Sequence, residues 1–480
     1  MILQSCIVPD EVCGAAELYY RCSGRLQTDH GCVLLRAGEE LSSCTYMNLF
    51  DAGAWRKYTT VETLRFRCRT EGRGTIALIH REKAVEKKIK EVSFDSDEEQ
   101  NGLAVEIELP PEIRSGAVYF TLKADEETRL CEAGFWTDAS PDNEISLSLV
   151  ICTYKRKSCL ERNLAKLQSS PALKRLEEEK RFIVRVVDNA RELSDSYGKG
   201  IRVYPNENTG GSGGFSRGMD ESVREKETYR TTHVVLMDDD VELQTESLSR
   251  LYALLSHMRP EYARDSVAGR MFRLDRREVQ YTAAEIWNGG DLRHIGWNQE
   301  MTREENLAGM NDNTGAEYGG WWFACYPMEF VEQNRPLPFF LHCDDVEYGL
   351  RHGGTPIILN GIQVWHETYE YRQTPVIAYY DTRNPLIVNA LYHWNQSKEE
   401  VVENWKKKIS FYHAEGDFLS ERMAIEGMLD YIRDGTEIEG RDPAENHLRI
   451  ARKKHFVRLT NMFLWRMTKT LYELTYKRGR

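Results

Sequence analysis

The chain has 480 residues, more than the ~250 residues at which a single hydrophobic core stops growing, so we expect two or three domains. Hydrophobic residues make up 41% of the chain and charged residues 29%, which excludes wholesale disorder. The formal net charge of −12 argues against nucleic acid as a partner.

Targeting signals are not evident in the sequence. No run of about 18 uncharged apolar residues occurs, so we expect no transmembrane helix. The N-terminus has neither a basic segment nor a long apolar stretch, so we expect no secretory signal and a cytoplasmic protein. Eleven cysteines contain no CxxC pair, and buried free thiols are the favoured interpretation over a zinc site or disulfides.

Residues 1–143 have the pattern of an all-β domain. Period-2 alternation or β-rich composition predicts short strands, separated by Gly, Pro and Asp clusters, over residues 63–68, 74–79, 104–109 and 118–124. Several short strands at this spacing are typical of a β-sandwich. The polar stretch 138–144, which contains Pro141, marks the end of this domain.

Residues 144–382 alternate strands and helices, which predicts an α/β domain with an open, mostly parallel sheet. Strands are expected over residues 145–152, 182–187, 201–204 and 233–237, and a further one over 357–364. Ligands of such sheets bind beyond the carboxyl ends of the strands. Asp188, a glycine-rich segment and three aspartates follow such ends, so one cleft can gather all of them.

Residues 383–480 are predicted to form a helical, basic region. Phe456, Leu459, Phe463, Met467, Leu471 and Leu474 recur at helical spacing. This stripe is expected mainly to pack onto the rest of the protein. Between residues 449 and 480, ten Lys and Arg stand against one acid, which is more positive charge than packing requires and predicts contact with an anionic membrane surface.

The strongest local signal is Asp238-Asp239-Asp240 at the end of an apolar strand. Adjacent carboxylates repel one another unless a cation lies between them, and hard divalent ions prefer such oxygen ligands. An acidic turn before a helix near Thr245 is the structural alternative; we favour the metal.

The glycine-rich segment holds Gly210, Gly211, Ser212, Gly213 and Gly214. Its backbone N–H groups at a helix start can approach an anionic ligand closely, although a flexible loop is an equal alternative. It matches neither a dinucleotide-binding motif nor a P-loop.

Downstream, Asp344 and Glu347 fit a helix N-cap pattern, with Glu347 and Arg351 one turn apart as an ion pair. This N-cap pattern does not use Asp345, which is either a general base or a further capping residue. His366 at a strand end is either structural or a ligand for Mn²⁺. Of Trp321 and Trp322, one can be core and the other can stack on a sugar.

Taken in order, Thr153 to Arg156, Asp188, NTGGSGGFSRGM, MDDD, WW, DDVEYGLR and WH resemble the inverting glycosyltransferases of family 2 with the GT-A fold. More closely, they are similar to bacterial polymerising galactofuranosyltransferases. The resemblance covers nearly the whole chain and implies an N-terminal β-sandwich, a GT-A domain and a C-terminal helical region.

The resemblance also implies roles for single residues. Asp238, Asp240 and His366 correspond to ligands of Mn²⁺ or Mg²⁺, Asp345 to the catalytic base, and Asp344, Trp321 and Trp322 to acceptor contacts. The residues that correspond to donor contacts, with the nucleotide sugar, are Thr153, Arg156, Asp188, Asp239 and those of the glycine-rich segment. Glu367 departs from the family, which often has an apolar residue there.

The implied reaction is a single displacement that inverts the anomeric carbon, with UDP-galactofuranose as donor and a growing, lipid-linked cell-surface glycan as acceptor. The implied location is the inner face of the cell membrane, and homo-oligomerisation stays open. Another nucleotide sugar, such as a rhamnosyl donor, and an inactive carbohydrate-binding scaffold are the alternatives. A nucleotidyltransferase is disfavoured because the chain opens with a β domain instead of a basic glycine-rich loop.

Overall fold

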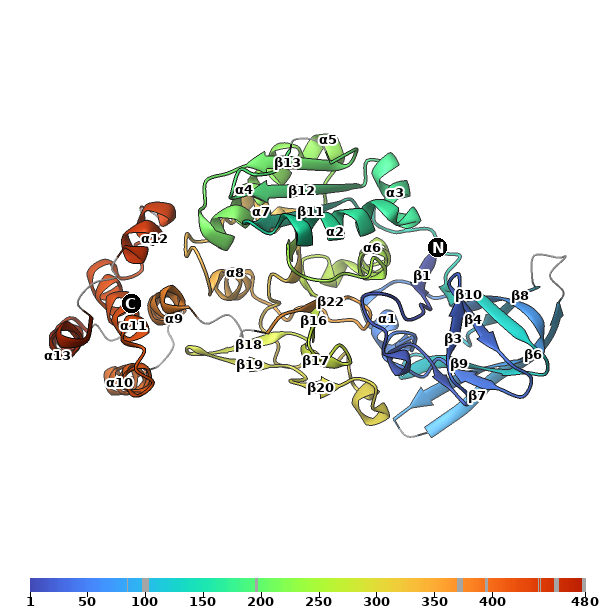
Figure 1. Ribbon diagram of the computed structural model, residues 1–480. Coiled ribbons are helices and arrows are strands. Elements are labelled where there is room, and N and C mark those ends of the chain that lie inside the picture. The colour runs from blue at the N-terminus through green and yellow to red at the C-terminus, as the bar shows by residue number, and fades with distance from the viewer. Residues whose placement is uncertain are drawn as a thin grey trace.

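The computed structural model describes residues 1–83, 85–96, 103–194, 197–368, 374–392, 396–438, 440, 442–452 and 457–476. In chain order they form an antiparallel β region, a central α/β region and a group of C-terminal helices (Figure 1). The predicted fold class is confirmed. The boundaries at 143/144 and 382/383 remain a proposal, and helix α9 (Pro375–Leu391) runs across the second of them.

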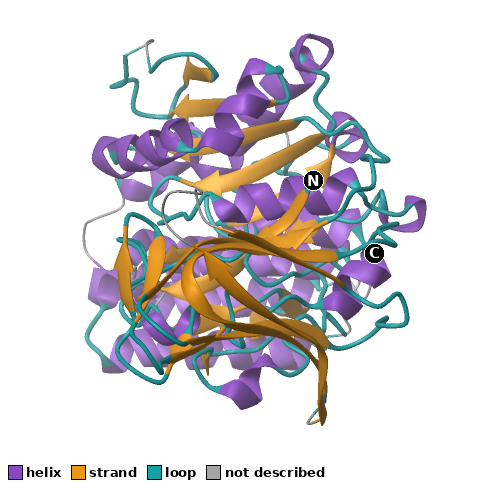
Figure 2. Cartoon of the chain, turned by 90° about the vertical axis from the view of Figure 1, so that its right-hand side faces the viewer, coloured by secondary structure: helices purple, strands orange, loops and turns teal. Residues whose placement is uncertain are grey.

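The N-terminal region is a curled antiparallel sheet, which Figure 2 shows toward the viewer. Its central strand is β6 (Arg65–Glu82), and the strands predicted over 63–68 and 74–79 are wrong as separate elements because both lie in this one strand of 18 residues. The first half of β6 pairs with β8 (Leu103–Glu108) and β10 (Thr128–Trp136), the second with β7 (Val85–Ser96) and β9 (Ala117–Ala124). Between the halves, Gly72 has φ +99°, and a Cβ there would lie 2.5 Å from the Glu127 carbonyl oxygen.

The curl brings the two halves of the sheet onto one aromatic core. Phe66 and Phe120, from different halves, have ring centroids 4.8 Å apart, and Phe50 stacks on Phe135 at 4.3 Å. The remaining elements here are β1 (Ile2–Ser5), η1 (Ala16–Leu18), β2 (Arg21–Cys22), β3 (Gln27–Asp29), β4 (Cys32–Leu35), β5 (Glu40–Ser42) and α1 (Ala52–Tyr58).

The central sheet has the order β13-β12-β11-β14-β21-β15. Its strands are β11 (Leu147–Thr153), β12 (Phe182–Asp188), β13 (Ile201–Pro205), β14 (His233–Asp238), β15 (Val267–Ala268) and β21 (Phe323–Pro327). The first four in this order run parallel, as predicted, and β21 is antiparallel to β14. Every residue of β12 is buried, which agrees with a sheet covered on both faces.

Helices cover this sheet, with α4 packed directly on β11 and β12. The helices of this region are α2 (Lys157–Ser169), α3 (Pro171–Glu178), α4 (Gly210–Arg224), α5 (Lys226–Tyr229), α6 (Glu246–Ser256), η3 (Pro260–Tyr262), η4 (Glu304–Leu307), α7 (Met328–Gln333) and α8 (Asp344–His352). Helix α6 begins after Thr245, where the sequence predicts it.

A second, smaller sheet has the order β20-β17-β16-β22. It holds β16 (Arg270–Arg273), β17 (Val279–Thr282), β20 (Gln299–Glu300) and β22 (Gln363–His366), and a hairpin of β18 (Glu285–Asn288) and β19 (Asp291–His294) lies nearby. The strand predicted over 357–364 is wrong for its first part, since β22 begins at Gln363. Gly361 has φ +81°, a left-handed conformation that interrupts an extended strand.

The C-terminal helices are α9, α10 (Lys398–Ala414), α11 (Phe418–Asp434), α12 (Pro443–Ala451) and α13 (Val457–Thr475). The expectation that the apolar stripe packs inward is wrong: Phe463 and Leu474 are 70% and 77% exposed, and Met467 and Leu471 are also exposed. Instead α13 turns Thr468 and Tyr472 inward. Phe456 and the side chain of Leu459 lie outside the described residues.

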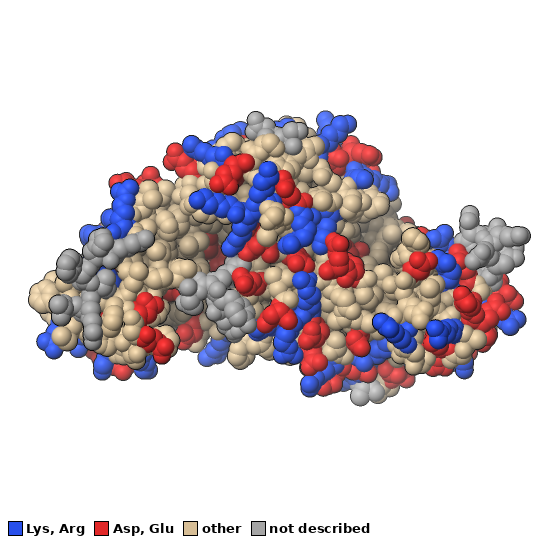
Figure 3. All heavy atoms as spheres, in the orientation of Figure 1, with Lys and Arg blue, Asp and Glu red and all other residues tan. Residues whose placement is uncertain are grey.

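The charged side chains and the cysteines can be compared with the expectations from composition. Basic and acidic side chains are interspersed over the face drawn in Figure 3. All eleven cysteines fall in the described ranges and are free, as predicted. Among the described residues, none of the helices has both the length and the apolar character needed to cross a bilayer.

Candidate active site

Three predicted site residues end neighbouring strands of the central sheet. Thr153 ends β11, Asp188 ends β12 and Asp238 ends β14. The register places Thr153 beside Asp188 and Cys152 beside Asp238. The parallel strands therefore deliver these side chains to one edge of the sheet, where α/β folds bind ligands.

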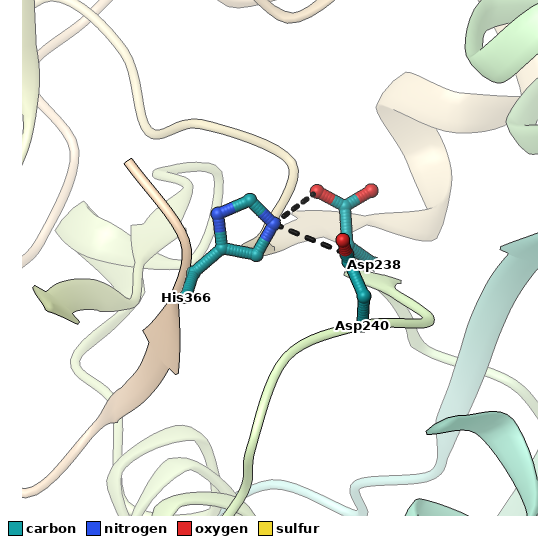
Figure 4. A group of neighbouring side chains, drawn as sticks. All are labelled: Asp238, Asp240 and His366. Carbon is teal, nitrogen blue, oxygen red and sulfur yellow. Dashed lines mark hydrogen bonds and ion pairs between the residues drawn. The ribbon is translucent and has the colours of Figure 1, made fainter. Parts of the chain in front are cut away.

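Asp238, Asp240 and His366 lie together at this edge (Figure 4). His366 reaches it from β22 of the smaller sheet, and its Nε2 lies 3.2 Å from Asp240 Oδ1 and 3.5 Å from Asp238 Oδ2. One ligand atom of each residue lies within 4.8 Å of the others. Two carboxylates and an imidazole form a donor set that fits Mn²⁺ or Mg²⁺, so the residues present suit the predicted ion.

Asp239, between the two, has other partners. Thr153 Oγ1 donates to Asp239 Oδ2 at 2.6 Å, and the Arg156 guanidinium lies 3.3 Å from Asp239 Oδ1 and 2.8 Å from Asp240 Oδ2. Burial raises the pKa of Asp239. Arg156 thus offsets part of the charge that three adjacent aspartates accumulate.

Asn163 on α2 stabilises the same turn and was not predicted as a site residue. Its buried amide donates to the carbonyl oxygens of Asp239 at 3.2 Å and Val241 at 2.9 Å. Local spacing does not reveal this contact, because Asn163 lies in the middle of a helix and its partner Asp239 is 76 residues further along the chain.

The Asp188 carboxylate organises the loop after β12. Its Oδ1 accepts a hydrogen bond from Ala190 N at 2.9 Å, and its Oδ2 accepts from Glu192 N at 2.7 Å and Leu193 N at 2.8 Å. A contact between Asp188 and the nucleotide stays a prediction, and the described loop geometry already gives this side chain a structural role.

The glycine-rich segment forms the first turns of α4 instead of a loop. A Cβ on Gly214 would lie 2.1 Å from Cys152 Sγ, so this glycine lets the helix approach β11. Gly210 has φ +74°, and a Cβ there would lie 2.0 Å from the Phe340 carbonyl oxygen. Close packing therefore explains why glycine stands at these two positions. A contact between the start of α4 and an anionic ligand stays a prediction.

Asp344 and Asp345 form the start of α8. The N-cap is Cys343, with φ +65°, so the prediction of Asp344 as N-cap is wrong by one residue because the left-handed Cys343 already ends the loop. The predicted Glu347–Arg351 ion pair is confirmed, with Arg351 Nε 3.0 Å from Glu347 Oε1.

Both carboxyl groups at this helix start have raised pKa values. Burial is the main cause for each, and the charge of Asp345 adds to it at Asp344. The charges of Glu285 and Asp238 also raise the pKa of Asp345, which places its carboxyl in the same electrostatic field as the Asp–Asp–His cluster. A carboxylate whose pKa is raised in this way is suited to accept a proton near neutral pH.

Glu285 is a further acidic group that sequence reasoning missed. It is buried on β18, and His294 on the paired strand β19 has its Nδ1 2.6 Å from Glu285 Oε2. Burial raises the pKa of Glu285. The cross-strand pairing that joins the two residues is not visible in a lone Glu and a lone His nine positions apart.

Trp321 and Trp322 are both buried, each with 4% of its surface exposed. Trp321 packs edge-on against Phe215 and Tyr348, with centroids 5.2 and 5.6 Å away, and Trp322 Nε1 donates to the Gly269 carbonyl oxygen at 2.9 Å. Neither ring presents an open face for stacking on a sugar, so their acceptor contacts stay a prediction. Glu367, next to His366, is exposed.

Two family descriptions match the chain. "Galactofuranosyltransferase 2 N-terminal" matches residues 10–138, and "Glycosyltransferase like family 2" matches residues 144–373.

Curated relatives are similar over most of this chain. Galactofuranosyltransferase GlfT2 of Mycobacterium tuberculosis is 26% identical over 395 residues, which are 76% of this chain and 60% of the relative. GlfT2 of Mycolicibacterium smegmatis is 26% identical over 387 residues, 74% of this chain and 58% of the relative. The chain thus spans less than two thirds of the length of these relatives.

Among solved structures, mannosyltransferase PcManGT from Pyrobaculum calidifontis in complex with GDP-Man and Mn²⁺ aligns with 70% of this chain and 90% of its own, at 11% identity and a TM-score of 0.33. That TM-score is too low to support an inference. The two family matches carry the assignment: residues 144–373 belong to glycosyltransferase family 2, and residues 10–138 are of the galactofuranosyltransferase 2 N-terminal type.

Proposed function

We propose that this glycosyltransferase moves galactofuranose from UDP-galactofuranose onto a growing cell-surface glycan, with inversion at the anomeric carbon. The observation that carries the proposal is the occurrence, in one chain, of a galactofuranosyltransferase 2-type N-terminal region and a family 2 region with an Asp–Asp–His cluster. The 26% identity to GlfT2 supports this donor over other nucleotide sugars.

In this proposal Asp238, Asp240 and His366 hold a divalent ion, Mn²⁺ or Mg²⁺. When bound, such an ion supplies positive charge to the diphosphate oxygens of the donor. The guanidinium of Arg156, which already contacts Asp239 and Asp240, adds positive charge at the same edge. Thr153, Asp188, Asp239 and the start of α4 form the donor side of the site.

Asp345 is the proposed catalytic base. Its carboxylate takes the proton of an acceptor hydroxyl while that oxygen forms a bond to the anomeric carbon of the donor sugar. The bond between that carbon and the diphosphate oxygen breaks, and UDP leaves with the electron pair. One displacement from the opposite face inverts the anomeric carbon, so only one carboxylate base is needed.

The donor assignment is tested by incubating the purified protein with Mn²⁺, a synthetic lipid-linked galactan acceptor and one nucleotide sugar at a time. UDP-galactofuranose, UDP-galactopyranose and dTDP-rhamnose are compared, and mass spectrometry reads the product. Asp345→Asn serves as a matched control for background transfer. Transfer from dTDP-rhamnose alone would show that the protein is a rhamnosyltransferase. Transfer from none of the donors would favour an inactive carbohydrate-binding scaffold.

We further propose that the protein associates peripherally with the inner face of an anionic membrane through α13. The outward face of α13 carries Met462, Phe463, Met467, Leu471 and Leu474, all exposed. Its inward face packs on α11, where Asn461 Nδ2 donates to the Phe418 carbonyl oxygen at 3.1 Å, and Trp465 meets Trp405 of α10 edge-on at 4.5 Å. An anchored helix with exposed apolar residues beside Lys and Arg suits an interface with acidic lipid, where a lipid-linked acceptor would lie.

A further inference from the structure

The loop that leads into α8 has an unusual backbone. Phe340, His342 and Cys343 have φ values of +77°, +61° and +65°. Residues other than glycine rarely adopt this left-handed region, because Cβ approaches the following carbonyl oxygen. Three such residues among four consecutive positions need contacts from outside the loop to keep this conformation.

Helix α9 supplies most of these contacts. The Asn384 side chain is fully buried, and its Nδ2 donates to the carbonyl oxygens of Leu341 at 2.7 Å and His342 at 2.9 Å. Arg383 donates from Nη2 to the Phe339 carbonyl oxygen at 3.0 Å and from Nε to Asn384 Oδ1 at 2.9 Å. The second bond orients the amide of Asn384 so that its N–H groups face the loop.

A charged contact from the same helix reaches the loop side chain. His342 Nδ1 lies 2.5 Å from Asp381 Oδ1, and the carbonyl oxygen of Asp381 accepts a hydrogen bond from Lys408 Nζ on α10 at 2.7 Å. Two C-terminal helices are therefore connected to the residue that stands two positions before Asp344.

The loop is also held between α12 and α4. The Phe340 ring stacks on His447 of α12 at 4.0 Å and on Tyr380 of α9 at 5.6 Å. Its backbone N–H donates to Ser212 Oγ on α4 at 3.0 Å, and its carbonyl oxygen occupies the space that Gly210 leaves open. The start of α4 and two C-terminal helices thus all contact Phe340.

Because Cys343 is the N-cap of α8, the conformation of the loop sets the direction of the turn that carries Asp344 and Asp345. We propose that Asn384, with Asp381 and Arg383, is a positioning residue: through loop 339–343, α9 aims Asp345 at the acceptor hydroxyl. This inference rests on the proposed function. It gives α9 a role in catalysis, separate from the proposed membrane contact through α13.

The test replaces Asn384 by leucine, which has similar volume but no donor. Asn461→Leu on α13 is the matched control, because Asn461 is also buried and its Nδ2 donates to the Phe418 carbonyl oxygen and to Glu421. We expect Asn384→Leu to lower kcat by about 10- to 100-fold per folded molecule, since a misplacement of about 1 Å has effects of that size. Affinity for UDP with Mn²⁺, measured by calorimetry, should fall by a smaller factor than kcat, because the bonds that Asn384→Leu removes hold the loop at Leu341 and His342, whereas the donor-side start of α4 contacts Phe340.

A rescue variant separates positioning from general stability. Glycine adopts left-handed φ without cost, so adding Cys343→Gly to Asn384→Leu should recover part of the lost kcat. Asn461→Leu should lower the melting temperature and leave kcat unchanged. Loss of kcat in Asn461→Leu equal to that in Asn384→Leu would overturn the proposal, because general destabilisation would then explain both.

Hydrogen exchange of residues 339–346, read by mass spectrometry, gives a measure that needs no turnover. Exchange there should be faster in Asn384→Leu and unchanged in Asn461→Leu. Unchanged exchange, or faster exchange with wild-type kcat, contradicts the proposal. If the wild type transfers no sugar from any donor, the proposed function fails, while the exchange measurement still decides whether α9 holds this loop.

Discussion

Replacing Asp345 by asparagine separates the two roles that a carboxylate at the start of α8 can have. Asp345 Oδ1 accepts a hydrogen bond from Val346 N at 2.8 Å, and an asparagine oxygen can keep that bond. The change therefore retains size and local hydrogen bonding and removes the negative charge and the basicity. A base contributes about 10²- to 10⁴-fold to a proton-transfer step, so we expect turnover to fall by that factor.

The structure also predicts the sign of the stability change. Burial raises the pKa of Asp345, so its ionised form destabilises the folded chain at pH values above that pKa. Each unit by which folding raises a pKa costs about 1.4 kcal/mol at such pH. Asp345→Asn should therefore be more stable than the wild type by about 1–3 kcal/mol at pH 8, and this difference should disappear below the unfolded carboxyl pKa of about 3.9.

Two assays on the same preparation decide this prediction. Denaturant unfolding at pH 8 and pH 4 gives the free energy of unfolding, and sugar transfer at saturating donor and acceptor gives kcat. A variant that is less stable at pH 8 but turns over at the wild-type rate per folded molecule would show that Asp345 is a capping residue, and the base assignment would be wrong.

Three further outcomes follow from the same site and surface. Activity should be lost in excess EDTA and restored by Mn²⁺ or Mg²⁺, and Asp240→Ala should not be restored; wild-type rates with EDTA would exclude the ion. On the acid side, kcat should fall with an apparent pKa above the ordinary carboxyl value of about 3.9, because Asp345 must be ionised; a flat profile down to pH 5 would contradict this. Co-sedimentation with anionic vesicles should weaken with salt and with Lys/Arg→Gln changes over 449–480 or Phe463→Ser; equal binding by wild type and variants would leave α13 without a membrane role.

Much of the catalytic region was predictable because its signals are local. Apolar strands that end in polar residues predicted β11, β12 and β14, and the rule that parallel strands expose their carboxyl ends at one edge brought Asp188 and Asp238 together. Thr153, which was assigned from the family resemblance, lies at the same edge. The proximity of His366 to the aspartates followed from the family resemblance, since its position along the chain alone favoured a structural histidine.

The features that escaped sequence reasoning depend on long-range contacts. Strand β6 continues through Gly72, because bending the sheet there places both halves on one core, whereas a glycine in isolation predicts a break. The apolar stripe of α13 predicted an inward face, yet Thr468 and Tyr472 occupy it. The pairs Glu285–His294 and Asn384–His342 join residues whose contact is set only by the fold.

The most direct test of the central claim is product analysis with purified protein, UDP-galactofuranose, Mn²⁺ and a lipid-linked galactan acceptor. We predict new glycosides that grow by single hexose units, carry furanose rings by NMR and have the anomeric configuration opposite to that of the donor. Product with the configuration of the donor, or transfer only from a different nucleotide sugar, would contradict the proposed mechanism or the proposed donor, respectively.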